Sequence, residues 1–303
     1  MKVIVHGGAG SAPDEPTPRQ EVLREAADAG AAEASVVDAA EAAVRVLESS
    51  PRFNAGVGGA VQSDGVIRTD AGLMTSDREA GAVCSMPGVE HAVSAARVVM
   101  EETPHVLVSG ERAVDLAADF GVETDVDLWT EDSRERWDDL DSTPDGSPSE
   151  HLDWLREKFG GYAATSARDD GGPSPNPKDH DTVGAVAYDG DEFAAATSTG
   201  GRWLALAGRV GDVPQVGSGF YAAPAGAASA TGAGEDIARA TLTRRAVGHL
   251  ESGHDARRAA DLAIEEFAEL TGSSAGVIVL DRNGDTGSAF NSEAMQTSVG
   301  GPE

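Results

Sequence analysis

Residues 180–187, His-Asp-Thr-Val-Gly-Ala-Val-Ala, decide how the chain is organised. A polar segment rich in proline and glycine ends here, and a stretch with the composition of a buried strand begins at Thr182. If the peptide bond between Asp181 and Thr182 breaks, Thr182 gains a free α-amino group that can act as the base for its own hydroxyl. An α-amino group has a pKa of about 7.7–8.0, so part of it is neutral near pH 7. The alternative is a β-branched residue that only opens a strand, and these residues alone leave both open.

The composition indicates a globular and strongly acidic chain. Its 303 residues can bury a full core, as one large domain or two ordinary ones. Asp and Glu number 52 against 23 Lys and Arg, for a formal net charge of -29 at pH 7. Such self-repulsion destabilises a compact state in dilute buffer, whereas 1 M salt, with a Debye length of about 3 Å, screens it. We therefore expect a halophilic protein from a salt-rich cytoplasm, with an ordinary acidic enzyme as the alternative.

The same composition disfavours several partners and compartments. Nucleic acid is not expected, because phosphate binding requires basic patches. There is no apolar run of about 18 residues, so no membrane span or membrane partner is expected. The first residues, MKVIVHGGAG, turn to glycine too early for a signal peptide. The single cysteine, Cys84, excludes an internal disulfide and a cysteine metal cluster, which fits a reducing cytoplasm.

Hydrophobic periodicity predicts helices and strands throughout the first 121 residues. An alanine-rich stretch has apolar residues at helical spacing and reads as two helices with a break near Gly30. Residues 47–59, LESSPRFNAGVGG, are dense in turn formers, and their carbonyls either surround a monovalent cation or simply belong to an ordered turn. The expected strands are 2–6, 61–69 and 80–86, and the expected helices lie within 19–48, 89–102 and 111–120.

From about residue 122 to 181 the pattern changes. Acidic residues, proline and glycine dominate, which predicts a flexible linker or a leader that delivers the scissile bond, with at most a short helix over 152–159. After Thr182, strands and helices return, and this division at 181 favours stacked layers of sheet and helix. The expected strands are 183–188, 192–197, 217–221, 226–231, 277–280 and 288–291, and the expected helices are 235–250 and 256–270.

Seven motifs, taken in order, carry a resemblance to a known family. They are VIVHGGAG, LESSPRFNAGVG, AARVVMEETPHV, DTVGAVA, AAATSTGG, GRVGDVP and SATGAGE. Together they resemble the plant-type L-asparaginase/isoaspartyl peptidase family of N-terminal-nucleophile (Ntn) hydrolases, over nearly the whole chain except about 122–178. The resemblance implies an α+β fold, a four-layer αββα sandwich in a single domain. It also implies self-cleavage into 1–181 and 182–303 and a homodimer of cleaved protomers.

The resemblance also implies roles for individual residues. Thr182 is the nucleophile and base, and Thr199 hydrogen-bonds it. Arg209 binds the substrate α-carboxylate and Asp212 the α-ammonium, although the pair could equally be an exposed ion pair of little energetic value. Thr231 and Gly232 form the oxyanion hole, with Gly234 in the same substrate-binding loop, although this stretch also reads as a helix N-cap. No cofactor takes part in the chemistry; a structural Na⁺ or K⁺ would be bound by the carbonyls of Leu47, Glu48, Ser50, Phe53, Ala55 and Val57.

The expected function is an autoprocessed threonine amidohydrolase that releases L-aspartate from L-asparagine and β-aspartyl (isoaspartyl) dipeptides. The chain departs from the family at Asp181, where glycine is common. An Asp-Thr pair after His180 is typical of glycosylasparaginases, the alternative function, but Gly201 stands where those enzymes usually carry asparagine. A non-catalytic glycine-rich module, for instance one that binds nucleotides, is disfavoured because no strand-GxGxxG-helix unit is present.

Overall fold

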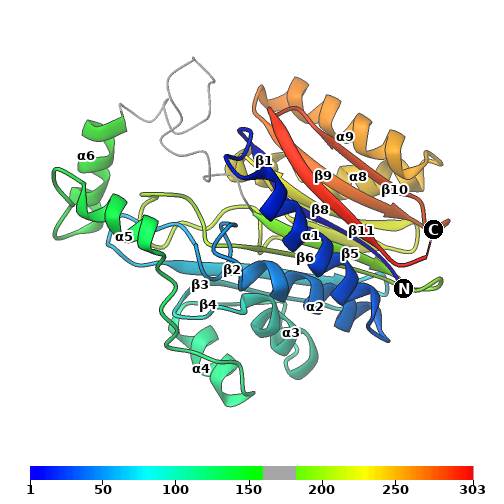
Figure 1. Cartoon of the computed structure of the whole chain (residues 1–303), viewed down its shortest axis with the longest axis horizontal. Helices are drawn as coiled ribbons and strands as arrows, with labels where there is room; N and C mark the ends of the chain where they lie inside the picture. Colours follow the sequence, from blue (N-terminus) through cyan, green and yellow to red (C-terminus); the bar gives the residue numbers. More distant parts are fainter. Residues whose placement is uncertain (160–181, 303) are drawn as a thin grey trace.

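The computed structural model describes residues 1–159 and 182–302, and within them two β-sheets lie face to face with helices on their outer sides (Figure 1). The larger sheet has the strand order β11-β1-β5-β6-β2-β3-β4. Its neighbours are antiparallel except β3 and β4, which are parallel. Its strands are β1 (Lys2–Gly10), β2 (Arg68–Thr75), β3 (Ala80–Pro87), β4 (Leu107–Ser109), β5 (Val183–Tyr188), β6 (Phe193–Thr199) and β11 (Ala294–Gly300).

The smaller sheet is antiparallel and has the order β10-β9-β8-β7. It consists of β7 (Phe220–Ala223), β8 (Gly226–Gly232), β9 (Ala275–Asp281) and β10 (Thr286–Phe290). Helices α1 (Pro16–Ala31), α2 (Val36–Glu48), α3 (Ala92–Glu102) and α4 (Glu111–Asp119) lie on the side of the larger sheet. Helices α7 (Gly234–Ala240), α8 (Leu242–Glu251) and α9 (Ala256–Thr271) lie on the side of the smaller one.

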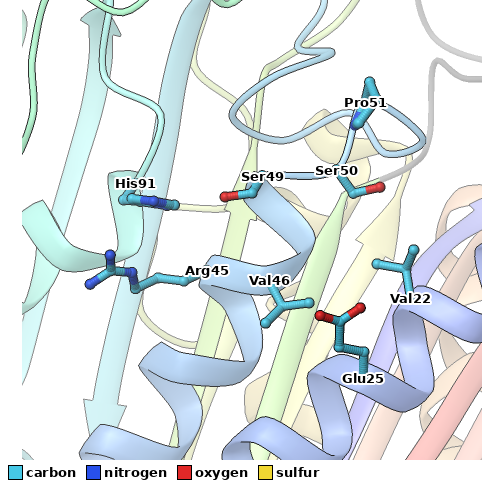
Figure 2. Close-up of a pocket in the computed structure, with 8 residues that line it drawn as sticks. All are labelled: Val22, Glu25, Arg45, Val46, Ser49, Ser50, Pro51 and His91. Atoms are coloured by element: carbon cyan, nitrogen blue, oxygen red, sulfur yellow. The ribbon is translucent and has the colours of Figure 1, made fainter.

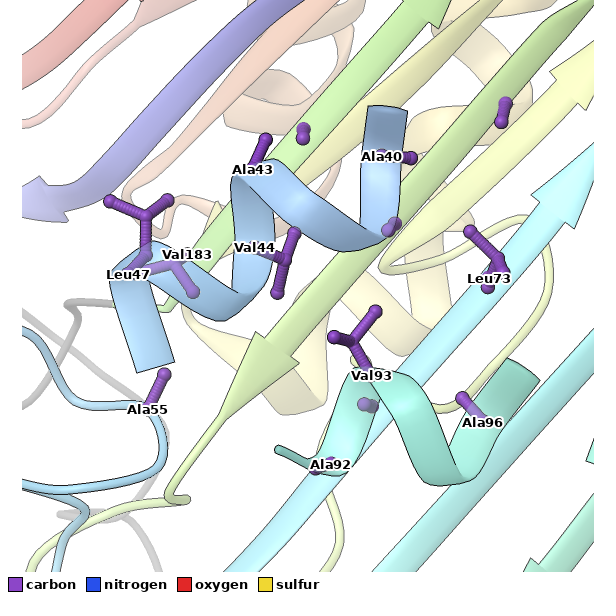
Figure 3. Close-up of a cluster of buried hydrophobic side chains, with 14 of the residues drawn as sticks. Ala40, Ala43, Val44, Leu47, Ala55, Leu73, Ala92, Val93, Ala96 and Val183 are labelled. Atoms are coloured by element: carbon purple, nitrogen blue, oxygen red, sulfur yellow. The ribbon is translucent and has the colours of Figure 1, made fainter. Parts of the chain in front are cut away.

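Three hydrophobic clusters hold these elements together. The first lies between the larger sheet and its helices, where Val44 of α2 and Val93 of α3 point toward strand residues such as Leu73 (Figure 3). The second joins the two sheets through residues such as Phe193 and Phe220. The third joins the smaller sheet to α8 and α9. The predicted mixture of α-helices and β-sheets is therefore confirmed.

Small residues set how closely the layers approach. A Cβ on Gly72 of β2 would lie 1.9 Å from Phe220 Cε1 of the opposite sheet, so the aromatic ring occupies the space above that glycine. Between α1 and α2, a Cβ on Gly30 would lie 2.7 Å from the carbonyl oxygen of Ala39. Glycine at these positions allows close contact at the cost of helix and strand propensity.

The helical break predicted near Gly30 is confirmed: α1 ends at Ala31, and the Ser35 side chain accepts a hydrogen bond from Asp38 N and starts α2. Several other predicted element bounds were wrong. Thr241, in a left-handed conformation, divides the helix expected over 235–250 into α7 and α8. Residues 61–67 contribute only an isolated bridge, and the strand expected there begins at Arg68. Strand β11 was not predicted, because its residues are mostly half-buried and its polar run Gln296, Thr297 and Ser298 lacks the pattern of a buried strand.

The prediction that residues 122–181 do not order themselves was wrong for 122–151, and the short helix expected over 152–159 is confirmed. Residues 122–159 include α5 (Glu131–Asp138) and α6 (Pro148–Phe159), at the end of the molecule opposite the two termini (Figure 1). Trp129, Trp137 and Trp154 pack against Trp203 and Leu128, since large rings supply apolar surface that an acidic average composition conceals. The remaining residues of the predicted linker, with His180 and Asp181, lie outside the described residues. Among residues 1–159 and 182–302, no helix is both long and apolar enough to span a bilayer.

Candidate active site

Thr182 directly precedes β5 in the middle of the larger sheet, and its side chain is 8% exposed. Thr182 Oγ1 donates a hydrogen bond of 3.2 Å to Thr199 Oγ1. The antiparallel register pairs Val183 with Ser198, so the start of β5 and the end of β6 bring the two hydroxyls together. Thr199 Oγ1 also accepts a hydrogen bond of 3.2 Å from Gly201 N, which fixes the hydroxyl beside the candidate nucleophile.

Arg209 and Asp212 lie together in the loop that precedes β7, and both are largely buried. Arg209 Nε and Nη2 donate to the two carboxylate oxygens of Glu235 at 2.8 and 2.7 Å. Burial would raise the pKa of Glu235, but the hydrogen bonds and charge of Arg209 hold it at about 2. This bidentate pair fixes the plane of the guanidinium through Nε and Nη2. The sequence analysis missed Glu235, although it closes the SATGAGE motif.

One carboxylate oxygen of Asp212 accepts no hydrogen bond from the described residues. That oxygen, Oδ2, is buried. Burial raises the pKa of Asp212 to about 7, and the positive charge of Arg209 only partly opposes that shift. A Cβ on Gly234 would lie 2.8 Å from both Arg209 Nη2 and Asp212 Oδ1. Arg209 and Asp212 therefore both lie directly against the Gly234 backbone, where a guanidinium and a carboxylate together suit the carboxylate and ammonium groups of an α-amino acid.

Thr231 and Gly232 end β8, and β8 packs against β5 and β6 across the two sheets. Gly232 has φ 134°, and a Cβ there would lie 2.6 Å from Ser274 O, so the backbone conformation and the packing both require glycine. The oxyanion-hole assignment stays a prediction, as do the roles of the other predicted site residues.

Asp70 is a buried acid that the sequence analysis did not identify. It stands opposite Thr199 in the β2–β6 ladder, is 2% exposed, and accepts a hydrogen bond of 2.7 Å from Ser85 N. Burial raises the pKa of Asp70 to about 7, against the opposing charge of Arg209. Asp70 also interacts electrostatically with Asp212. The available sequence signal was a charged residue within the run RTDAGLMT, which is otherwise a buried strand.

A polar network joins the two sheets close to Thr182. His6 Nε2 lies 2.9 Å from Ser229 Oγ, which lies 2.6 Å from Thr197 Oγ1, and Thr197 donates to Gly219 O at 2.9 Å. A Cβ on Gly184 would lie 2.0 Å from Ser229 Oγ, so the glycine after Val183 makes room for this network. Burial lowers the pKa of His6 to about 3, against a smaller effect of a hydrogen bond to the Thr182 backbone, so the imidazole is neutral.

The predicted cation loop is tied to the turn after β6. Asn54 Nδ2 donates to Gly201 O at 2.6 Å, and the buried Glu48 accepts from Ser198 Oγ at 2.6 Å. Three of the six predicted carbonyls, those of Leu47, Glu48 and Ser50, already accept backbone hydrogen bonds within the loop. Within the described residues, the carbonyls of Phe53, Ala55 and Val57 accept none from the backbone outside helices and strands. The loop thus retains oxygen donors of the type that Na⁺ or K⁺ binds, and a cation there stays a prediction.

A pocket of about 510 Å³ lies on the helix side of this loop (Figure 2). It contains none of the predicted catalytic or substrate-binding residues. It is lined by Val22 and Glu25 of α1, Arg45 and Val46 of α2, Ser49, Ser50 and Pro51 of the loop, and His91.

The comparisons with known proteins agree with these motifs. The profile of the family described as "Asparaginase" matches residues 1–301. A "Plant-type L-asparaginase" of Pyrococcus abyssi is 39% identical over 307 residues, covering 97% of this chain and 94% of the relative. An "Isoaspartyl peptidase/L-asparaginase" of Danio rerio is 37% identical over 303 residues, covering 97% of this chain and 90% of the relative. The site is that of a hydrolase acting on amide bonds, and the chain belongs to this asparaginase family.

Proposed function

We propose that the chain is a threonine amidohydrolase that releases L-aspartate from L-asparagine and from β-aspartyl (isoaspartyl) dipeptides. The observation that carries the proposal is the buried hydroxyl pair of Thr182 and Thr199. The opposite charges of Arg209 and Asp212 around Gly234 supply a place for the α-amino-acid end of the substrate. The names of the relatives, L-asparaginase and isoaspartyl peptidase, support the same substrates.

The chemistry follows from these groups once Thr182 is N-terminal. Its α-amino group takes the proton from Oγ1, and Oγ1 attacks the β-carbonyl carbon of the substrate. The Thr231 hydroxyl and the Gly232 N–H stabilise the tetrahedral oxyanion. The α-ammonium of Thr182 returns its proton to the leaving ammonia or amine, and a water molecule then hydrolyses the ester between Thr182 and aspartate. Arg209 and Asp212 bind the substrate α-carboxylate and α-ammonium throughout.

Further features belong to the same proposal. The two face-to-face sheets with outer helices support the αββα sandwich of Ntn-hydrolases in a single domain. Maturation cleaves the Asp181–Thr182 bond and gives chains 1–181 and 182–303, which assemble as a homodimer of cleaved protomers. A structural Na⁺ or K⁺ binds the carbonyls of the 47–59 loop. We place the protein in a salt-rich cytoplasm, on account of its net charge of -29 and single cysteine.

A glycosylasparaginase is the second candidate, because Asp181 precedes the candidate nucleophile as it does in those enzymes. Kinetics with pure protein in molar KCl distinguish the two. The proposal requires faster turnover of L-asparagine or a β-aspartyl dipeptide than of N4-(β-N-acetylglucosaminyl)-L-asparagine. The reverse order would establish the second candidate in its place.

Intact mass spectrometry tests the proposed mechanism directly. The wild-type preparation should contain two chains that meet between residues 181 and 182. Thr182→Ala should remain a single chain without hydrolase activity, whereas Thr103→Ala is the matched control. The Thr103 hydroxyl donates to Val99 O at 2.9 Å at the C-terminal end of α3, so its loss should leave both cleavage and turnover intact. Hydrolysis by purified Thr182→Ala would refute the proposal.

A further inference from the structure

We propose that His151, on α6, is a positioning residue for the loop 203–209, which presents Arg209 to the substrate. The inference rests on the proposed function, in which Arg209 binds the substrate α-carboxylate. His151 acts through Ser63: Ser63 Oγ lies 2.9 Å from His151 Nδ1, and both side chains are buried. The two residues are 88 positions apart, and neither belongs to any of the motifs that identify the family.

Ser63 connects α6 to the loop through three polar contacts. Its N–H donates to Ala205 O at 2.8 Å, and its Oγ accepts from Ala207 N at 3.1 Å. A serine hydroxyl has one proton and two acceptor sites. Because Ala207 N–H uses an acceptor site, the hydroxyl proton is available for His151 Nδ1, which accepts when the imidazole proton is on Nε2. Removing the imidazole would leave the proton of this buried hydroxyl without its acceptor, and the hydroxyl would be free to rotate.

The neighbouring residues of the same segment hold the rest of the loop. Leu204 N donates to Val61 O at 2.7 Å, and Gly208 N donates to Gln62 Oε1 at 2.8 Å. Arg68 Nη1 donates to the same Gln62 oxygen at 2.8 Å. The segment from Val61 to Ser63 is therefore the support on which the loop lies.

Part of the loop backbone is strained. Leu204 has φ 55°, in the left-handed region that disfavours residues with a Cβ, whereas glycine readily adopts the φ of 82° at Gly208. The loop has no helix or strand of its own in the described structure, and its internal backbone hydrogen bonds include Arg209 N to Leu206 O at 2.8 Å. Hydrogen bonds to residues 61–63 and side-chain packing from outside hold this turn in place.

Helices α5 and α6 supply that packing. The guanidinium of Arg136 on α5 lies 4.0 Å from the ring centroid of Trp203, the first residue of the loop. Trp137 of α5 lies against Gly65, where a Cβ would be 3.0 Å from its Cζ2. Trp154 of α6 belongs to the same hydrophobic cluster as Trp203 and Leu204. The segment 122–159 thus covers the outer side of the loop, and His151 is its polar contact with the support.

This arrangement predicts an effect on substrate binding and not on the chemical steps. Arg209 holds the α-carboxylate in the ground state and in the transition state alike, so a displaced loop raises KM and leaves kcat nearly unchanged. Thr182 precedes β5 and Thr199 ends β6, whereas the side-chain hydrogen bond of His151 is to Ser63. A purely structural role of His151 would instead lower stability without changing KM.

The experiment measures L-asparagine kinetics in molar KCl, with enzyme concentration corrected for the cleaved fraction by intact mass. His151→Ala should raise KM about five- to tenfold, with kcat within about twofold of wild type. His151→Asn should restore most of the affinity, because its Oδ1 can replace Nδ1 as the acceptor. Ser63→Ala should raise KM similarly, and the double variant should add little to either single one. His105→Ala, at an exposed histidine on another face of the fold, is the matched control.

An active wild-type enzyme with unchanged KM in His151→Ala would overturn the inference while leaving the proposed function intact. So would an equal loss of affinity in His151→Asn, or a fall in urea stability with unchanged KM. Additive effects of the two single variants would overturn it as well. If His151→Ala does not fold, Ser63→Ala decides alone: a raised KM supports the coupling and an unchanged KM overturns it. A wild-type protein that hydrolyses neither substrate removes both proposals.

Discussion

At the scale of single residues, the site is defined by an excess of acids, two of them buried, around one guanidinium. Asp70, Asp212 and Glu235 all interact electrostatically with Arg209, but only Glu235 has the bidentate contact. Burial raises the pKa of Asp70 and of Asp212 to about 7, so neither is fully ionised in the free protein near neutrality. A substrate ammonium placed beside Asp212 would favour its ionised form.

Gly234→Ala tests whether the space between Arg209 and Asp212 is the substrate site. A methyl group there would lie 2.8 Å from Arg209 Nη2 and from Asp212 Oδ1, and so it would displace one or both of these side chains. We expect KM for L-asparagine to rise at least about tenfold, with cleavage at residue 182 unaffected. Gly248→Ala on α8 is the matched control, because the added Cβ meets only Arg244 Nη1, at 3.4 Å. Unchanged kinetics in Gly234→Ala would place the substrate elsewhere.

Asp70→Asn tests the electrostatic cost of the buried acid through stability. The folded pKa of about 7 is above the unfolded value of 3.8, so the folded state holds more protons between those pH values. Stability therefore falls as pH rises from about 4 to about 7, and asparagine removes this dependence while its Oδ1 still accepts from Ser85 N. We expect the unfolding free energy of the variant, relative to that of wild type, to increase by on the order of 3 kcal/mol between about pH 4 and pH 7. Urea unfolding in constant high salt measures this difference. Asp119→Asn, at an exposed acid, is the control, and a pH-independent difference would contradict the account.

At the scale of elements, hydrophobic periodicity predicted most helices and strands, whereas tertiary contacts determined the residues at which they begin and end. Helices α2 and α9 follow their apolar spacing and start at side-chain caps, Ser35 and Asp255. The break at Thr241 has no glycine or proline to announce it. Helix α5 has a strongly polar sequence, and its place depends on rings contributed by Trp129, Trp137 and Trp203. Local pattern alone cannot show such long-range contacts.

Gly72→Ala tests the contact between the two sheets. The new Cβ would lie 1.9 Å from Phe220 Cε1, so the ring must move or the sheets must separate. We expect a loss of about 1–3 kcal/mol in unfolding free energy, the usual cost of overpacking a core. Adding Phe220→Leu should recover part of the lost unfolding free energy, because the smaller side chain leaves room for the new methyl group. Gly248→Ala again serves as the control, and a neutral Gly72→Ala would mean that the sheets lie farther apart than described.

At the scale of the whole molecule, charge is the dominant physical variable. A net charge of -29 on 303 residues opposes the compact state, and many of the described ion pairs are exposed and contribute little each. The helices of both outer layers nevertheless bury alanine-rich faces against the sheets, and these hydrophobic contacts do not involve charged groups. Salt is therefore expected to act by screening repulsion.

A salt titration tests this expectation. Raising KCl from 0.1 to 2 M at pH 7.5 should increase the melting temperature by on the order of 10 °C, because screened charges repel less. The same titration near the isoelectric point of about 4.4 should have a much smaller effect, since the net charge is then close to zero. An equal salt response at both pH values would indicate a general salt effect on burial and would contradict the halophilic interpretation.

The sequence by itself determined the family, the mixed helix-and-sheet class, most of the regular elements and the candidate nucleophile. These follow from short motifs, their order and local periodicity, which are properties of neighbouring residues. Only the tertiary structure decided that Asp70 stands opposite Thr199, that Glu235 holds Arg209 and that His151 contacts Ser63. Those pairs depend on strand register and on the packing of distant segments, because a buried polar group is placed by whichever partner the whole fold brings within hydrogen-bonding distance.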